Sequence, residues 1–96
     1  MAKSILQTEK ECWVTRSTDG LHKHHIFYGK NRQASEKWGC WVWLRNDWHN
    51  MASYGVHFNK ELDDTLKQAC QEEFERRYSH ELFMQIFGRN YIKGGE

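Results

Sequence analysis

Histidines are concentrated in one part of this 96-residue chain. Five of its six histidines lie between positions 22 and 57, at His22, His24, His25, His49 and His57. If several of these side chains share one site, the segments around positions 24, 49 and 57 must fold back onto one another. That requirement constrains the fold more than any other feature of the sequence.

Chain length and cysteine usage narrow the class of protein. Ninety-six residues make a single domain. The three cysteines, Cys12, Cys40 and Cys70, contain no CxxC pair, which argues against a disulfide framework and favours a reduced, cytoplasmic setting. The N-terminus lacks the apolar run of a signal peptide, and no stretch approaches the roughly 20 apolar residues of a membrane span. We therefore expect no membrane association.

Charge is distributed unevenly along the chain. Residues 1–58 carry eight Lys and Arg against five Asp and Glu, and residues 59–96 carry six against eight. The basic excess therefore accompanies the histidines, although the net charge is only +1. This distribution is compatible with a ligand that bears phosphate.

The first 58 residues indicate extended and irregular structure. Residues 1–10 predict a loose lead-in, and residues 12–15, 21–28 and 41–44 favour strands. Residues 29–39 predict a polar loop with one helical turn, in which Ser35 is the N-cap and Gly39 the stop. Asn46 or Asp47 can then cap a short helix that runs to about Ser53.

From Asn59 onward the apolar residues change their period. They recur at intervals of four, four, three and four, which is one face of an amphipathic helix, at Leu62, Leu66, Ala69, Cys70 and Phe74. Asn59 is the expected N-cap of this helix. Ser79 caps a second helix over residues 80–87, which Gly88 ends. Residues 59–92 therefore predict a helical cover over a core formed by residues 11–58.

The adjacent pair His24 and His25 can serve chemistry in two ways. Neighbouring strand residues point to opposite faces, but at a strand end both can approach one site. One imidazole can then bind a metal ion while the other takes a proton from water near pH 7. With His49 and His57, three imidazoles and open water positions would make a catalytic rather than a closed structural metal site. The alternative is that each histidine is simply solvated or hydrogen-bonded, as we expect for His22 and His80.

Five short motifs carry a family resemblance. In chain order they are LHKHHIF from Leu21, SEKWG from Ser35, WVWL from Trp41, WHN from Trp48 and YGVHF from Tyr54. Together they resemble the small phage-type HNH endonucleases, and are similar to the phage recombination-enhancing nuclease group of the ββα-metal fold. The resemblance covers residues 12–58 and is looser in the helical tail. It implies an α+β domain with a two-stranded antiparallel ribbon, a short helix and two C-terminal helices.

The resemblance also implies roles for single residues. His24, His49 and His57 match the ligands of one divalent metal ion (Mg²⁺, Mn²⁺ or Zn²⁺), and His25 matches the general base. Either Asn46 or Asn50 matches the asparagine that braces the base or its loop. The implied function is a metal-dependent DNA endonuclease or nickase of phage origin, associated with recombination in the cytoplasm of a bacterial host and acting as a monomer or homodimer.

Basic residues close to the histidines are the candidate DNA contacts. Lys30, Arg32 and Lys37 lie in the loop that follows His25, and Arg45 follows the second strand. Such side chains can meet backbone phosphates, which position a duplex without reading its sequence. The alternative is a solvated loop without a partner.

One departure from the family pattern keeps a rival function open. Cys12 begins a pair that binds a structural zinc in many relatives, but Thr15 stands at the second position and Trp48 precedes His49 where a further cysteine is common. We expect tryptophan packing, by Trp13, Trp41, Trp43 and Trp48, to replace that zinc. The rival is a catalytically degenerate HNH-like module that binds DNA, or a host defence protein that it antagonises. A third alternative is an adaptor in which the histidines hold zinc only for folding.

Overall fold

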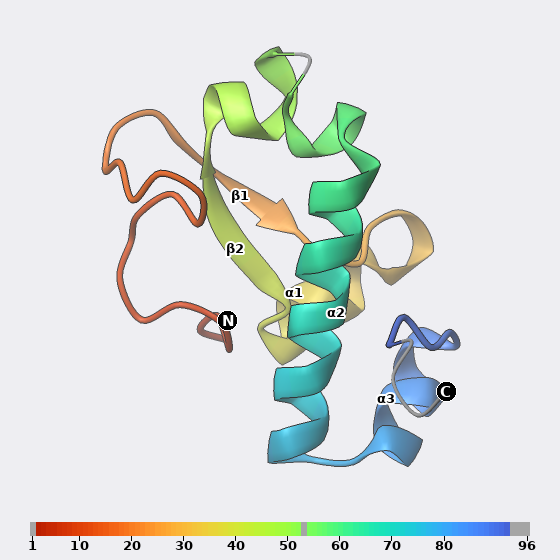
Figure 1. The fold of residues 1–96 in the computed structure, drawn as a ribbon. Helices are drawn as coiled ribbons and strands as arrows, with labels where there is room; N and C mark the ends of the chain where they lie inside the picture. Colours follow the sequence, from red (N-terminus) through yellow and green to blue (C-terminus); the bar gives the residue numbers. More distant parts are fainter. Residues whose placement is uncertain (1, 53, 93–96) are drawn as a thin grey trace.

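The computed structural model describes residues 2–52 and 54–92, which form an α+β domain built on a two-stranded antiparallel ribbon (Figure 1). Within these residues, no helix is both long and apolar enough to cross a membrane. The elements follow in the order β1 (Leu21–His25), η1 (Gly29–Asn31), α1 (Arg32–Trp38), β2 (Trp41–Arg45), the π-helical turn η2 (Asp47–Met51), the 3₁₀ turn η3 (Val56–Phe58), α2 (Lys60–Arg77) and α3 (His80–Phe87).

The register of the ribbon separates the two adjacent histidines. His24 stands opposite Val42, and His25 stands opposite Trp41. Because successive side chains of a strand point to opposite faces, His24 and His25 lie on different faces of the ribbon. The His24 face carries Val42 and Leu44, which are fully buried in the core. The His25 face carries Trp41, which is buried and donates a hydrogen bond from its indole N–H to the Ala2 carbonyl.

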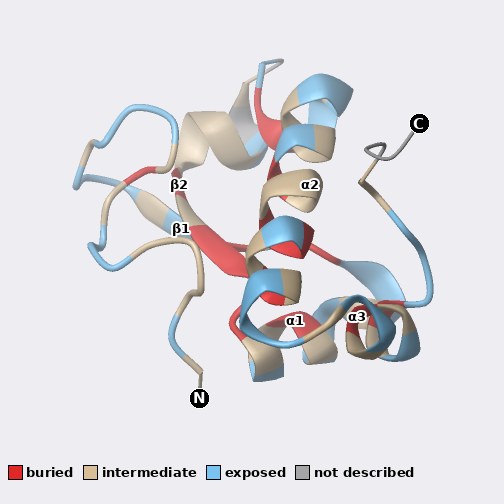
Figure 2. Ribbon diagram, turned by 60° about the horizontal axis from the view of Figure 1, so that its bottom comes forward, coloured by how far each residue is buried: buried red, intermediate tan, exposed pale blue. Residues whose placement is uncertain are grey.

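Helix α2 supplies the other half of the core, as its periodicity predicts. Leu66, Cys70 and Phe74 are fully buried and join the ribbon residues in one apolar cluster. Figure 2 shows the buried residues of the ribbon and of α2 facing each other. The predicted cap is also confirmed, since the Asn59 side chain accepts a hydrogen bond from the Leu62 N–H at 3.1 Å. This helix therefore packs against the buried face of the ribbon.

The boundaries of α3 agree with the sequence. Ser79 caps its first turn by accepting a hydrogen bond from the Leu82 N–H at 3.0 Å. Gly88 ends it in the left-handed region, at a φ of 77°. Phe83 and Phe87 are buried, so α3 closes the core on the side of the C-terminal segment.

The segment between the strands is more regular than predicted. Instead of a polar loop it forms η1 and α1, with Gly39 as the stop at a φ of 75°. Ser35 is not the N-cap, because it lies buried in the middle of α1. Its Oγ donates to the Phe27 carbonyl at 2.6 Å and accepts from the Phe27 N–H at 3.0 Å. This double hydrogen bond clamps α1 onto the chain that leaves β1.

The N-terminal segment is not a loose lead-in. The Ser4 hydroxyl donates to the Trp41 carbonyl at 2.6 Å, and the Gln7 side chain accepts from the Trp43 N–H at 2.8 Å. The segment therefore follows the edge of β2, next to the ribbon in Figure 1. Residues 12–15 form a turn rather than the expected strand. These contacts satisfy polar groups that an exposed strand edge would leave free.

The cysteines and three of the four expected tryptophans pack as the sequence predicts. Cys12, Cys40 and Cys70 are free thiols, and all three are buried. Trp41 is buried on the His25 face of the ribbon, Trp13 and Trp48 pack against the apolar cluster, and Trp43 is half-buried outside that cluster. The aromatic side chains thus form a large part of the packing around the ribbon.

Removing the Ser35 clamp tests its contribution to the fold. We expect Ser35→Ala to lower the free energy of unfolding by about 1–3 kcal/mol, because it leaves buried backbone groups of Phe27 without partners. Urea denaturation measures this change. Thr65→Ala removes an exposed hydroxyl bond within α2 and should stay within about 0.5 kcal/mol of the wild type. Equal stabilities of the two variants would contradict a role for the clamp.

Candidate metal centre

Three of the five clustered histidines meet in space. One ring nitrogen from each of His24, His49 and His57 lies within 4.8 Å of the others. The Nε2 atoms of His49 and His57 are 3.2 Å apart. Nitrogens that bind one ion at about 2.1 Å lie roughly 3–4 Å from each other. The three predicted ligands are therefore close enough to hold a metal ion.

A compact turn brings His49 and His57 back to the ribbon. Both carboxylate oxygens of Asp47 accept hydrogen bonds from the Arg45 guanidinium, at 2.7 and 2.8 Å, and the Tyr54 hydroxyl donates to Asp47 at 2.7 Å. Gly55 lies so close to this turn that an added Cβ would be 2.8 Å from the Asp47 carbonyl oxygen. Only glycine fits there, and the chain can then reverse between the two histidines.

His24 forms the buried floor of the cluster. It is 2% exposed, and its Nε2 has no hydrogen-bond partner among the residues that the structure describes. Burial, with a smaller contribution from the nearby His49 and His57, lowers the pKa of His24 to about 3, so the ring is neutral at pH 7. A buried ring nitrogen without a partner is costly, whether it carries a hydrogen or a lone pair. In the tautomer with its lone pair on Nε2, His24 could offer that nitrogen to a divalent cation, because neutral imidazole is a common metal ligand.

His49 is the half-buried member of the cluster, and a fourth histidine contacts it. Burial and the charges of His57 and His22 lower the pKa of His49 to about 4. Its Nδ1 lies 3.2 Å from Nδ1 of His22, on the side of the ring away from His57. His22 is exposed, as predicted, but it is not remote from the site. If Nε2 of His49 bound a metal, its Nδ1–H could donate to His22, which would fix the orientation of the ring.

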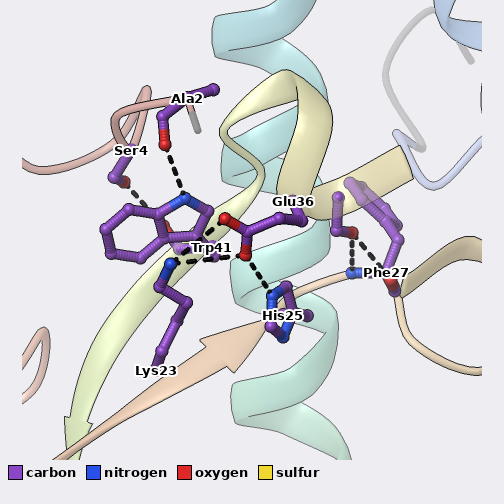
Figure 3. A network of polar contacts seen from close by, with 8 residues as sticks. Ala2, Ser4, Lys23, His25, Phe27, Glu36 and Trp41 are labelled. Atoms are coloured by element: carbon purple, nitrogen blue, oxygen red, sulfur yellow. Dashed lines mark hydrogen bonds and ion pairs between the residues drawn. The ribbon is translucent and has the colours of Figure 1, made fainter. Parts of the chain in front are cut away.

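His25 lies at the end of β1, on the other face of the ribbon. Its Nε2 is 2.7 Å from Oε1 of Glu36, and Lys23 contacts the same carboxylate at 3.3 Å (Figure 3). The hydrogen bond from His25 is the main reason that the pKa of Glu36 is lowered, so Glu36 is a carboxylate that can only accept. The contact therefore places a hydrogen on Nε2, and in the neutral form of the ring the lone pair is on Nδ1. Asn50, the other predicted catalytic residue, is exposed on η2.

Two residues near the histidines escaped the sequence prediction. Glu36 lies within the SEKWG motif, but nothing local shows that it reaches His25, which is 11 positions away. The position of His22 could have predicted that it lies near the site, because it is two residues before His24 and strand alternation places both on one face. The ring of His22 contacts His49, whereas the ring contacts of His24 are with His49, His57 and Tyr28.

The four basic residues predicted to contact DNA differ in whether their side chains are accessible to a ligand. Lys30, Arg32 and Lys37 are exposed on η1 and α1, so the structure leaves them accessible to a ligand. Arg45 gives two hydrogen bonds to Asp47 and thereby supports the turn that carries His49. A DNA contact by Arg45 stays a prediction.

Comparisons with models of known protein families, with curated proteins and with solved structures find no match. The resemblance to HNH endonucleases therefore stays a prediction from short motifs. The geometry of the histidines and their neighbours is therefore what bears on function.

Metal binding by the cluster can be measured directly. We expect one Zn²⁺ ion per chain, and a stability gain of about 2.7 kcal/mol when the free ion is at 100 times its dissociation constant. Replacing the exposed His57 by alanine should weaken the affinity by more than the roughly 10–100-fold that an outer-shell partner costs. His80→Ala, which removes a histidine paired with Glu75 outside the cluster, is the matched control. Zinc titration followed by calorimetry distinguishes the two variants, and equal affinities would exclude this site.

The pKa of His24 predicts how acid affects the metal-free protein. The folded value is about 3, whereas an unfolded imidazole titrates near 6.5. Between these values the unfolded chain binds a proton that the folded chain rejects. The free energy of unfolding should therefore fall as the pH falls below 6.5, by about 1.4 kcal/mol per pH unit for this group.

Urea denaturation between pH 6.5 and 5, above the range in which carboxylates titrate, measures this slope. His24→Leu removes the titrating ring at similar volume and should show a shallower dependence. The same slope in both proteins would show that His24 is not the buried neutral group.

Proposed function

We propose that the protein is a metal-dependent DNA endonuclease or nickase. The observation that supports this most is the convergence of His24, His49 and His57, whose ring nitrogens lie close enough to hold one metal ion. The adjacent residue, His25, is hydrogen-bonded to a carboxylate. Hydrolysis of a phosphodiester uses a metal ion and an oriented base, and the chain supplies a candidate for each at neighbouring positions of β1. Phage origin, a role in recombination and action in the bacterial cytoplasm rest on the motif resemblance alone.

The proposed general base is His25, with Glu36 as its positioning residue. Because Nε2 donates to Glu36, Nδ1 is the nitrogen that can take a proton from water. As the water oxygen forms a bond to phosphorus, its proton moves to Nδ1, the bond from phosphorus to the 3′-oxygen breaks, and the leaving oxygen is protonated from solvent. The carboxylate of Glu36 then stabilises the imidazolium of His25.

The histidine cluster supplies the other half of the proposed mechanism. His24 is buried, His49 is half-buried and His57 is exposed, so the cluster opens to solvent on the His57 side. Three protein ligands leave further coordination positions open. When bound, a divalent cation would polarise the scissile phosphate and stabilise the charge on the leaving oxygen. The rigid ribbon and the Asp47 turn hold the three imidazoles in place for it.

DNA is the proposed substrate because of the charge around this site. Residues 1–58 have three more basic than acidic side chains, and Lys30, Arg32 and Lys37 are exposed on the elements that directly follow β1. Phosphate contacts by these three residues would place a strand across the end of the ribbon, where His25 lies.

One observation favours an inactive binding module instead. His25 lies on the opposite face of the ribbon from the three proposed ligands, and it shares Glu36 with Lys23. A histidine, a lysine and a glutamate in contact can equally be a structural ion-pair cluster. The two functions differ in a measurable way, because only the enzyme needs a proton acceptor at position 25.

Plasmid cleavage separates these functions. We expect wild-type protein with Mg²⁺, Mn²⁺ or Zn²⁺ to nick supercoiled DNA, and His25→Ala to reduce the rate by about 10²–10⁴-fold. Glu36→Gln keeps an acceptor for Nε2 but removes the charge, so its rate should fall between the two. His80→Ala is the matched histidine control and should cut like the wild type. If metal-loaded wild type cuts neither the plasmid nor a single-stranded oligonucleotide with any of the three ions, the protein is not the proposed nuclease.

A further inference from the structure

One phenylalanine differs from all the others. Phe27, Phe74, Phe83 and Phe87 are between 0 and 3% exposed in the core. Phe58 is 66% exposed, and it directly follows the proposed ligand His57. A small domain gains stability by burying large rings. An exposed ring beside the candidate metal centre therefore needs a reason other than folding.

A second exposed ring faces the same space. Tyr28 is 46% exposed and comes from the segment after β1, whereas Phe58 ends η3. Both line a groove of about 370 Å³, together with His57 and Lys60. The Tyr28 ring centroid is 6.1 Å from that of His57 and 6.3 Å from that of His24. The groove is thus continuous with the histidine cluster and opens at the N-terminal end of α2.

Tyr28 is held firmly in this groove. Its hydroxyl donates to Asp63 at 3.1 Å and accepts from Lys67 at 3.2 Å. The Lys67 ammonium also lies 4.5 Å from the centre of the Tyr28 ring and 2.9 Å from Asp63. These contacts balance the charge of Asp63 and fix the ring before any ligand arrives. A ring that is already fixed loses little entropy on binding.

We propose that the groove between Tyr28 and Phe58 binds an unpaired nucleobase of the strand whose phosphate lies at the histidine cluster. Flat aromatic rings beside a phosphate site are what single-stranded nucleic acid uses for stacking. A base inside a duplex has both faces covered by its neighbours, so only an unpaired or flipped base can enter. The inference rests on the proposed nuclease function and names its substrate class: nucleic acid with unpaired bases at the cleavage point.

Binding without cleavage tests this inference. Fluorescence anisotropy in EDTA would compare a labelled 12-nucleotide single strand, its duplex, and the same single strand with its bases replaced by abasic sites. We expect the wild type to prefer the single strand with bases. Phe58→Ala should weaken that affinity by roughly 5–150-fold, the range of one stacked base. Phe58→Trp, which keeps a stacking face, should retain the affinity.

The control variant is Tyr78→Ala, because Tyr78 is also exposed (50%) but caps the opposite end of α2. It should bind the single strand like the wild type, and thermal unfolding would verify that each variant is folded. The inference is overturned if Phe58→Ala binds the single strand unchanged, if the abasic strand binds as tightly as the normal one, or if no oligonucleotide binds. Because no cutting takes place in EDTA, these outcomes are independent of the plasmid test. A protein that cuts plasmid but shows any of them keeps the nuclease function and loses this groove.

Discussion

The buried nitrogen of His24 is the constraint on which the site depends. An imidazole in an apolar core is tolerated when it is neutral, and its free lone pair then demands a partner. The ribbon, α2 and the turn from β2 to η3 exclude water from His24 and bring two further imidazoles next to it. Protons and a metal ion compete for the same lone pairs, so folding, pH and ligand binding are coupled at this one position.

Polar contacts hold the chain segments at the ends of the ribbon in place. Ser35 fastens α1 at the end of β1, and Asp47 fastens η2 at the end of β2. The first contact joins α1, which carries Glu36, to the chain that leaves β1, and the second joins η2, which carries His49, to β2. A domain of this size has little core to position loops by packing alone. Buried or bidentate polar contacts fix them instead.

The features that could be predicted from the sequence were mostly those that depend on residues close together in the chain. The period of α2, its Asn59 cap and the ends of α3 are set within a few residues, and the structure confirms them. The ligand cluster was predictable because histidine chemistry and spacing pointed to it. The Ser35 clamp, the Glu36 contact and the N-terminal segment were not, since each joins groups 8 to 37 positions apart. Such pairs become visible only when the ribbon register is known.

The register of the ribbon also determines whether the chain reaches its correct fold. His24 and His25 are neighbours in sequence, yet one faces the core and the other faces Glu36 only because β1 pairs with β2 in one alignment. A shift of the pairing by one residue would turn His24 away from the core, and in one direction it would bring Lys23 opposite Val42, where a neutral ring is needed. The charged lysine would then have to be desolvated, which makes the shifted alignment costly. The same alternation that separates the two histidines thus protects the domain against misfolding.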